Sequence, residues 1–192
     1  MKNQIEKILR ESIDVKTAVL EKLSGEIAVC AKMVSSCLKK GNKVLLLGNG
    51  GSFSDCLHIA AELLGRYKLN RKPLPCIVLG SNISALTAIS NDFGYECSFS
   101  KEMAAFGKKG DVAIAVSTSG RSKNVNNAAR QAKKLGVKVI ALTGASGGEL
   151  AKIADISIIV PSENTPRIQE SHIAIGHAIC EIAEREIFKN AR

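Results

Sequence analysis

Two side chains that can move protons or bind a metal, His58 and Glu62, stand four residues apart. On a helix this spacing places both on one face, where they can act on one small ligand. Just before them, the turn Gly48–Ser52 follows the apolar run Val44–Leu47, and three of its five residues are glycine. Backbone N–H groups that no side chain covers, at the start of a helix, favour an anion. The stretch therefore predicts an anion site beside an acid–base or metal-binding pair.

A second group of chemistry-bearing residues is the segment Ser117–Ser122, which carries four hydroxyls in six residues. Hydroxyls are costly to bury without partners, and they suit phosphate oxygens. The alternative is helix capping, for which Ser119 or Ser122 alone would suffice. Because capping needs one hydroxyl, the pattern favours a phosphate site, with Arg121 or Lys123 able to add charge. Its hydroxyl residues are Ser117, Thr118, Ser119 and Ser122.

The other two histidines, His172 and His177, lie in the segment that reads as the last helix. Five residues apart, they project about 140° apart and should not share one ligand. Gln169 precedes His177 by about 12 Å along the axis, so the two converge only if both side chains lean toward a midpoint. The spacing permits, without requiring, a metal site made of His58, Glu62, Gln169 and His177. The alternative for any one histidine is a hydrogen-bonded core or interface residue, which we prefer for His172.

The framework that must position these residues follows from the hydrophobic pattern. Short apolar runs bounded by turn residues predict five strands, at 44–47, 76–79, 112–116, 137–142 and 156–160. Helical stretches are expected at about 54–66, 84–90, 97–107, 122–135 and 166–188. Strands that alternate with helices predict an α/β fold, with one doubly wound parallel sheet and flanking helices. Such sheets bind ligands at the carboxyl ends of their strands, where both glycine- and serine-rich segments and Asn91-Asp92 would gather.

The chain is expected to form a single domain over residues 1–192, with a helical segment at 1–40 and an α/β core at 41–192. Residues 3–39 read as two helices broken near Ser24-Gly25. The first of them precedes the strands, so we expect it to pack on another subunit.

Composition excludes several functional classes. The formal charge is +9, but the basic residues are dispersed and lack aromatic partners, so we expect no nucleic-acid binding. No apolar run is long enough to span a membrane, and we expect no signal peptide. The six cysteines contain no CxxC pair, which predicts reduced thiols in a cytoplasmic protein. The glycine turn lacks the Lys of a P-loop, and Gly80-Ser81 stand where a nicotinamide site needs an acidic residue. A purely structural tight turn remains the alternative for Gly48–Ser52.

Taken together, these motifs resemble the sugar isomerase (SIS) domain family, and within it the branch that isomerises sedoheptulose 7-phosphate. The resemblance covers almost the whole chain. It is carried by Gly48–Ser52, the His58/Glu62 pair with Gly65-Arg66-Tyr67, Ala88–Gly94, Gly110-Asp111-Val112, Ser117–Gly120, Leu142-Thr143-Gly144, and Arg167–Glu170 with His172 and His177.

The resemblance implies a homotetramer with active sites near subunit interfaces, and one Zn²⁺ per subunit held by His58, Glu62, Gln169 and His177. It implies substrate contacts from Asn49, Gly50, Gly51, Asn91, Asp92, Ser117, Thr118, Ser119, Ser122 and Gln169, and we add Ser52 and Glu62. This chain departs from the usual pattern at Arg121, where an Asn is common, and at Phe53-Ser54 and Cys56.

The activity implied is ketose–aldose isomerisation of sedoheptulose 7-phosphate to D-glycero-D-manno-heptose 7-phosphate. That product would feed ADP-heptose or GDP-heptose and lipopolysaccharide or surface-polysaccharide synthesis. Glu62 is the expected base and His177 its acid–base partner. One alternative is an isomerase of another ketose phosphate. The other is a non-catalytic SIS-domain protein that binds the DnaA replication initiator, a branch that lacks the counterparts of Glu62 and His177.

Overall fold

A five-stranded sheet of order β2-β1-β3-β4-β5 organises the chain, whose residues 1–188 are described by a computed structural model. The strands are β1 (Val44–Gly48), β2 (Cys76–Val78), β3 (Val112–Val116), β4 (Lys138–Gly144) and β5 (Ile156–Val160). All neighbouring strands are parallel. The five predicted strands and the α/β class are confirmed, and every strand end lies within two residues of its prediction.

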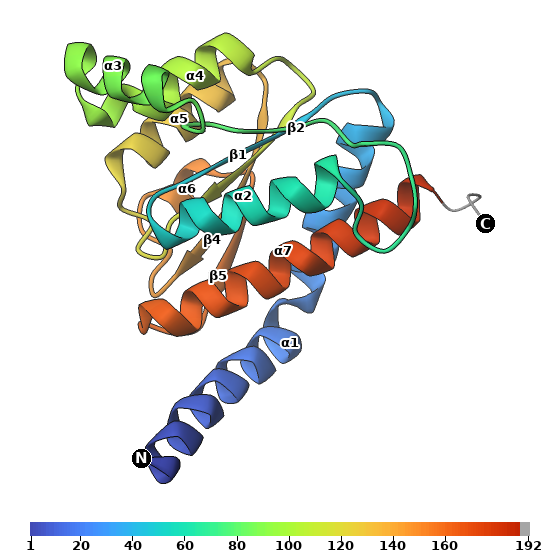
Figure 1. The fold of residues 1–192 in the computed structure, drawn as a ribbon, viewed down its shortest axis with the longest axis vertical. Coiled ribbons are helices and arrows are strands. Elements are labelled where there is room, and N and C mark those ends of the chain that lie inside the picture. The colour runs from blue at the N-terminus through green and yellow to red at the C-terminus, as the bar shows by residue number, and fades with distance from the viewer. Residues whose placement is uncertain (189–192) are drawn as a thin grey trace.

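Helices cover both faces of this sheet (Figure 1). The long α1 (Lys2–Lys39), α2 (Gly51–Leu64) and α7 (Thr165–Ile187) pack on one face. The other face carries α4 (Ser98–Phe106), α5 (Lys123–Lys134) and the short α6 (Leu150–Ile153). Between β2 and α4 lie α3 (Ile83–Phe93), which has no buried residue, and the 3₁₀ turn η1 (Tyr95–Cys97).

The strands are mostly apolar because both faces of the sheet are covered. In β1, Val44 and Leu46 point into the core beneath α1, α2 and α7. Leu45 and Leu47 point into the core beneath α4, α5 and α6. Side chains alternate between the two faces of a strand, so a strand buried on both sides shows no polar alternation. The short uninterrupted runs in the sequence are the result.

The predicted break near Ser24-Gly25 is wrong, because α1 runs unbroken from Lys2 to Lys39. The Ser24 hydroxyl donates to the Leu20 carbonyl one turn earlier, which is compatible with a continuing helix. A glycine inside a helix costs roughly 1 kcal/mol relative to alanine. The second half of α1 packs on the core through residues such as Cys30 and Val34, which are almost completely buried, and this packing outweighs that cost.

The start of α1 extends beyond the rest of the chain (Figure 1), and from Ile8 onward the helix is hydrogen-bonded to Arg167 and Glu170 of α7. The first half of α1 still carries apolar side chains that are half or more exposed, namely Ile5, Ile8, Leu9 and Ile13. Further differences from the sequence are small. The short helix α6 was not predicted, α2 begins three residues earlier than expected, and the 97–107 stretch divides into η1 and α4.

All six cysteines lie within the described residues, and all are free thiols. Burial raises the pKa of Cys30, Cys76 and Cys180 to about 12, so these thiols stay protonated and are poor nucleophiles. Five of the six cysteines are buried, and Cys97 is partly buried. Over residues 1–188 no helix combines the length and the apolarity needed to cross a bilayer.

Candidate active site

The strand order reverses between β1 and β3, because the chain goes from β1 to β2 on one side and returns to β3 on the other. In open parallel sheets the crevice at such a reversal binds ligands at the carboxyl ends of the strands. Gly48 of β1 is in register with Val116 of β3. The turn that follows Gly48 and the Ser117–Ser122 segment therefore leave the sheet side by side, as the sequence predicted.

Each glycine of the β1–α2 turn is required for a different structural reason. A Cβ on Gly48 would lie 3.0 Å from the backbone of Ser52, so no side chain fits there without a shift. Gly50 has a φ of 54°, in a region that L-residues with side chains avoid. A Cβ on Gly51 would lie 2.5 Å from Gln169 Nε2. The turn is shaped by the close approach of α7 as well as by its own curvature.

Asn49 is held by two residues that the sequence patterns did not single out, Asn124 and Tyr95. The Asn49 and Asn124 side chains exchange two hydrogen bonds, of 3.0 and 2.9 Å. The Tyr95 hydroxyl donates to Asn49 Oδ1 at 2.7 Å. Asn124 is buried in the first turn of α5, which places it beside the turn across the β1–β3 boundary. An asparagine two residues after the hydroxyl-rich segment was the available signal for this contact.

The Ser117–Ser122 segment does not use its hydroxyls for helix capping. Ser122 stands at the N-cap of α5, yet its side chain accepts no capping hydrogen bond from the described helix. Its Oγ lies 3.1 Å from Ser117 Oγ instead. The Ser119 Oγ accepts from the N–H of Arg121, a local turn contact. The structure therefore weighs against the capping alternative and leaves hydroxyls gathered at the strand end, next to the exposed Arg121.

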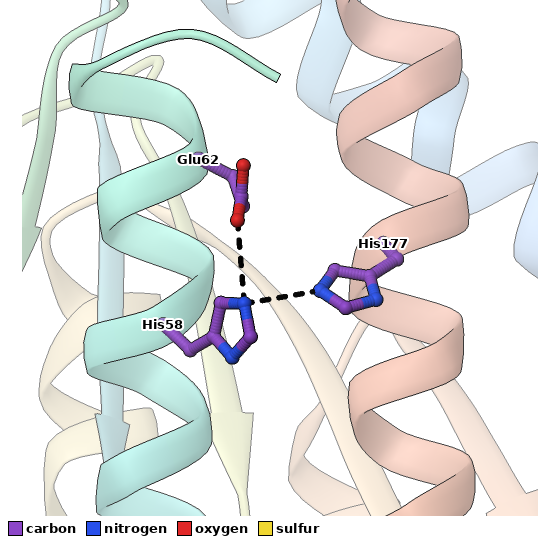
Figure 2. A group of neighbouring side chains, drawn as sticks. All are labelled: His58, Glu62 and His177. Carbon is purple, nitrogen blue, oxygen red and sulfur yellow. Dashed lines mark hydrogen bonds and ion pairs between the residues drawn. The ribbon is translucent and has the colours of Figure 1, made fainter. Parts of the chain in front are cut away.

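Three of the predicted site residues meet between α2 and α7 (Figure 2). His58 Nε2 lies 3.2 Å from Glu62 Oε1 and 3.3 Å from His177 Nε2. One ligand atom from each residue lies within 4.8 Å of the others. The group is open to one side, since the His58 side chain is 51% exposed. His58, Glu62 and His177, called the His–Glu–His cluster below, are the only such group of three found among the described residues.

This cluster fits a divalent metal ion. Two imidazole nitrogens and one carboxylate oxygen are typical zinc ligands, at bond lengths of about 2.0 to 2.2 Å. Tetrahedral geometry with such bonds places neighbouring ligand atoms about 3.3 Å apart, close to the 3.2 and 3.3 Å separations observed. Two Nε2 atoms that face one another also need a proton or a cation between them, which a metal would supply.

The cluster forms because α2 and α7 run in parallel and touch closely at Gly176. A Cβ on Gly176 would lie 2.5 Å from Ile59 Cδ1 and 2.8 Å from Ile59 Cγ1. Ile59 follows His58 and Gly176 precedes His177, so this contact sets the distance between the two imidazoles. The glycine at 176 is a requirement of the cluster.

Gly176→Ala should therefore destabilise the protein and weaken metal binding. Alanine in a helix gains up to about 1 kcal/mol over glycine, but overpacking a buried contact costs about 1–3 kcal/mol. Ile59 is 2% exposed and has little room to move, so the overpacking should dominate. Thermal unfolding and zinc titration measure the two effects.

The matched control is Gly25→Ala, another glycine inside a helix, where none of the described residues comes within 4 Å of the added Cβ. It should raise the free energy of unfolding by about 0.5–1 kcal/mol. Equal behaviour of the two variants would contradict the role of the Gly176 contact.

Gln169 is not brought to the cluster within one chain. Its amide lies against Gly51 at the start of α2, about 10 Å along the helix axis before His58. The same geometry separates the turn and the serine segment from the cluster, since α2 starts at the turn and Glu62 stands near its end. One chain thus holds two groups of predicted site residues, at opposite ends of α2.

Asn91, Asp92 and His172 belong to neither of these two groups. Asn91 and Asp92 lie exposed near the end of α3, where Asn91 Nδ2 donates to Asp92 Oδ1 at 2.9 Å. His172 is buried, and its Nε2 lies 3.0 Å from the Thr143 carbonyl. Burial lowers the pKa of His172 to about 4, which keeps it neutral. The core role preferred for His172 is confirmed.

Asp55 lies one turn before His58 on α2. Its Oδ2 is buried and has no hydrogen-bond partner among residues 1–188. Burial raises the pKa of Asp55, while the nearby His58 acts to lower it. The Asp55 carboxyl lies between the two groups of site residues, and it holds its proton more tightly than an ordinary carboxyl does.

Comparison with known proteins gives one consistent result. The family model described as "SIS domain" matches residues 9–144. The phosphoheptose isomerase of Aquifex aeolicus is 48% identical over 187 residues, which are 97% of this chain and 98% of that protein. The one from Sulfurimonas denitrificans is 47% identical over 190 residues, 98% of this chain and 97% of its own. The solved structure of a phosphoheptose isomerase from Francisella tularensis superposes with a TM-score of 0.92 at 39% identity, and covers 95% of this chain and 97% of that one.

Proposed function

We propose a function for this chain from one premise: it belongs to the SIS domain family, together with the phosphoheptose isomerases that match it over nearly its whole length. The chain is an aldose–ketose isomerase that acts on a heptose phosphate. It converts sedoheptulose 7-phosphate to D-glycero-D-manno-heptose 7-phosphate, for ADP-heptose or GDP-heptose and polysaccharide synthesis. The single observation that carries the chemistry is the His–Glu–His cluster, because it assembles the carboxylate and the imidazoles that the reaction needs.

The reaction moves a proton from C1 to C2 of the sugar through an enediol, so it needs a base at carbon and an acid at oxygen. We propose Glu62 as the base, because its carboxylate is partly open to a ligand. His177, on the facing helix, would exchange the proton with the sugar oxygens. His58 lies between them and holds both side chains in place.

Zinc is the metal that the cluster suits best, with His58, Glu62 and His177 as ligands. When bound, it would polarise the oxygens on C1 and C2 and stabilise negative charge that develops there. Gln169 remains a predicted fourth ligand, and its amide lies about two helical turns from the cluster. Without Gln169, the other three ligands would leave the fourth position open, as catalytic zinc sites do.

The phosphate and the sugar chain are assigned to the other end of α2. Ser117, Thr118, Ser119 and Ser122 would bind the phosphate, with Ser52 as a further donor. Asn49, Gly50, Gly51, Asn91, Asp92 and Gln169 would lie along the sugar. The support is the convergence of the turn and the serine segment at the β1–β3 boundary and the absence of a capping role for Ser122. Arg121 would add charge that favours phosphorylated sugars.

Because the two groups of site residues are separated within one chain, we propose that neighbouring subunits of a homotetramer complete each active site. An apolar groove between α1 and α7 supports this, lined by residues including Val19, Leu20, Ile27, Ile175 and Ile182. Leu20 and Ile182 of this groove are 69% and 39% exposed, and a contiguous exposed apolar patch typically marks an interaction site. A second copy of the chain is the occupant proposed for the groove. A monomeric mass by light scattering would contradict it.

A cytoplasmic location is proposed from the free, mostly buried thiols, which are typical of a reducing compartment. An isomerase of another ketose phosphate is the second candidate, since a phosphate site recognises the phosphate group more strictly than the length of the sugar's carbon chain. The non-catalytic DnaA-binding alternative is disfavoured by the assembled Glu62 and His177.

The test is a substrate panel. Purified protein is incubated with C5, C6 and C7 ketose phosphates, with and without a zinc chelator. We expect aldose product from sedoheptulose 7-phosphate, and loss of that product with chelator that returns on adding Zn²⁺. Product from another sugar alone would overturn the heptose assignment, and full activity in chelator would overturn the metal.

A further inference from the structure

The carboxylate of Glu184 organises a loop beside the His–Glu–His cluster. Glu184 lies on α7 seven residues after His177, so both face the same side of the helix. Its oxygens accept hydrogen bonds from the backbone N–H groups of Tyr67, Lys68 and Leu69, at 3.1, 2.8 and 2.8 Å. The loop that follows α2 is therefore folded around one acidic side chain of α7.

Arg71 links the same carboxylate to the end of α2. Its Nε donates to Glu184 Oε2 at 2.8 Å. Its two terminal nitrogens donate to the carbonyls of Glu62, Leu63 and Gly65, at 2.7, 2.8 and 3.0 Å. The last carbonyls of a helix have no partner within it, so the guanidinium supplies the bonds that the end of α2 lacks.

Both charged groups are removed from water, since the side chains of Arg71 and Glu184 are 1% and 2% exposed. A buried ion pair persists only when its remaining hydrogen-bonding capacity is used. Here three backbone N–H groups donate to the Glu184 carboxylate, and the Arg71 guanidinium donates to three backbone carbonyls. Burial would raise the pKa of Glu184, but these N–H donors and Arg71 lower it overall, so the carboxylate stays charged. All three guanidinium nitrogens of Arg71 and both carboxylate oxygens of Glu184 are thus hydrogen-bonded.

This geometry reaches the cluster from both helices. On α2, Arg71 binds the carbonyl of Glu62 itself. On α7, Glu184 holds the backbone of Tyr67, whose ring lies 5.8 Å from the His177 ring. The pair thus connects the residue that carries the carboxylate with the helix that carries the second imidazole.

We propose that Arg71 and Glu184 are positioning residues for the active site, which hold Glu62 and His177 at the separation that metal binding and proton transfer require. The inference rests on the proposed function of the His–Glu–His cluster. Neither residue contacts the substrate or the metal in this role. They act through the last turn of α2 and through the loop that carries Tyr67.

The alternative is that the pair only stabilises the fold. The chain offers a matched control for this, the buried pair of Lys43 and Asp111. Lys43 Nζ lies 2.6 Å from Asp111 Oδ2, and Asp111 is fully buried. Asp111 also accepts from the backbone N–H groups of Lys43 and Lys108. This pair joins the segment before β1 to the loop before β3, and among the described residues none of its hydrogen bonds reaches α2 or α7.

The experiment compares Arg71→Lys and Glu184→Gln with Asp111→Asn. Each apo protein is titrated with Zn²⁺ in competition with a coloured chelator, at a temperature where circular dichroism shows it folded. Residues that orient metal ligands affect metal affinity by about 10–100-fold. We expect zinc dissociation constants about 10-fold or more above wild type for the Arg71 and Glu184 variants, and within twofold for Asp111→Asn.

Kinetics with sedoheptulose 7-phosphate give a second readout. The two variants should lower kcat about 10-fold with KM within twofold, and Asp111→Asn should change neither. Should Glu184→Gln fail to fold, Arg71→Lys decides, because it keeps the charge and loses only the branched set of donors. Wild-type zinc affinity and kcat in the folded variants would overturn the positioning role. A wild-type protein that binds no zinc would overturn the metal proposal instead, and kcat alone would then decide the positioning.

Discussion

Replacing Glu62 by glutamine should lower kcat for sedoheptulose 7-phosphate by about 10³-fold, with the protein still folded. General acid–base catalysis by one positioned group contributes roughly 10²–10⁴-fold. Glutamine keeps the shape of the side chain but cannot accept the C1 proton, and it is a weaker metal ligand than a carboxylate. Because Glu62 is 23% exposed at its side chain and its backbone is held by Arg71, the fold should tolerate the change. Steady-state kinetics and circular dichroism measure the two parts.

A surface glutamate serves as the control for this substitution. Glu6 is 53% exposed at its side chain and pairs with Lys2, 3.9 Å away on the first turn of α1. Glu6→Gln should leave kcat within twofold, since exposed ion pairs contribute little. His177→Ala should act in the same direction as Glu62→Gln. Near-normal turnover by either cluster variant would contradict the assignment of acid and base.

Gly120→Ala should destabilise the protein more than Gly176→Ala does, because two costs combine at one position. Gly120 has a φ of 63°, and a Cβ there would lie 2.0 Å from the carbonyl oxygen of Gly147. Left-handed strain of about 1–2 kcal/mol adds to about 1–3 kcal/mol of overpacking, so the free energy of unfolding should fall by about 4 kcal/mol. Both clashing groups are backbone, and neither can rotate away.

The same substitution should weaken substrate binding. The Gly120 N–H donates to the Ser117 carbonyl, and the Gly120 carbonyl accepts from the Leu150 N–H, so a shift there moves the hydroxyls of the proposed phosphate site. Urea unfolding and KM report the two effects. The control is Gly41→Ala, at a φ of 75° with no described atom within 4 Å of the added Cβ, which should lose about 1–2 kcal/mol and leave KM unchanged. Equal unfolding midpoints for the two variants would show that the Gly147 contact is not rigid.

Much of the fold could be predicted because its signals are local. Five apolar runs bounded by turn residues became five parallel strands. The helix break at Ser24-Gly25 was wrong because a local glycine penalty was weighed without the packing of α1 on the core. The helix α6 is one turn long, too short to show a periodic pattern.

The site residues also fall into those that local spacing predicted and those that only the structure showed. His58 and Glu62 were placed on one face by their spacing alone, and the structure agrees. The spacing of Gln169 and His177 suggested that both could lean toward one point, but Gln169 lies against Gly51 instead. The partners of Asn49 and the pair of Arg71 and Glu184 have no motif, because each joins residues far apart in the chain.

The sequence by itself therefore determined the α/β class, the turn and serine segment at the strand ends, and the His58/Glu62 pair. These depend on periodicity and on residue types within a few positions. Only the tertiary structure decided that His177 joins that pair, since the distance between two helices is set by contacts such as Gly176 against Ile59. It also decided that the proposed phosphate site and the His–Glu–His cluster lie at opposite ends of α2. The direction of a helix relative to the sheet decides which of its turns lies near the strand ends. The distance between the two groups of site residues follows from that direction, and it cannot be predicted from spacing along the chain.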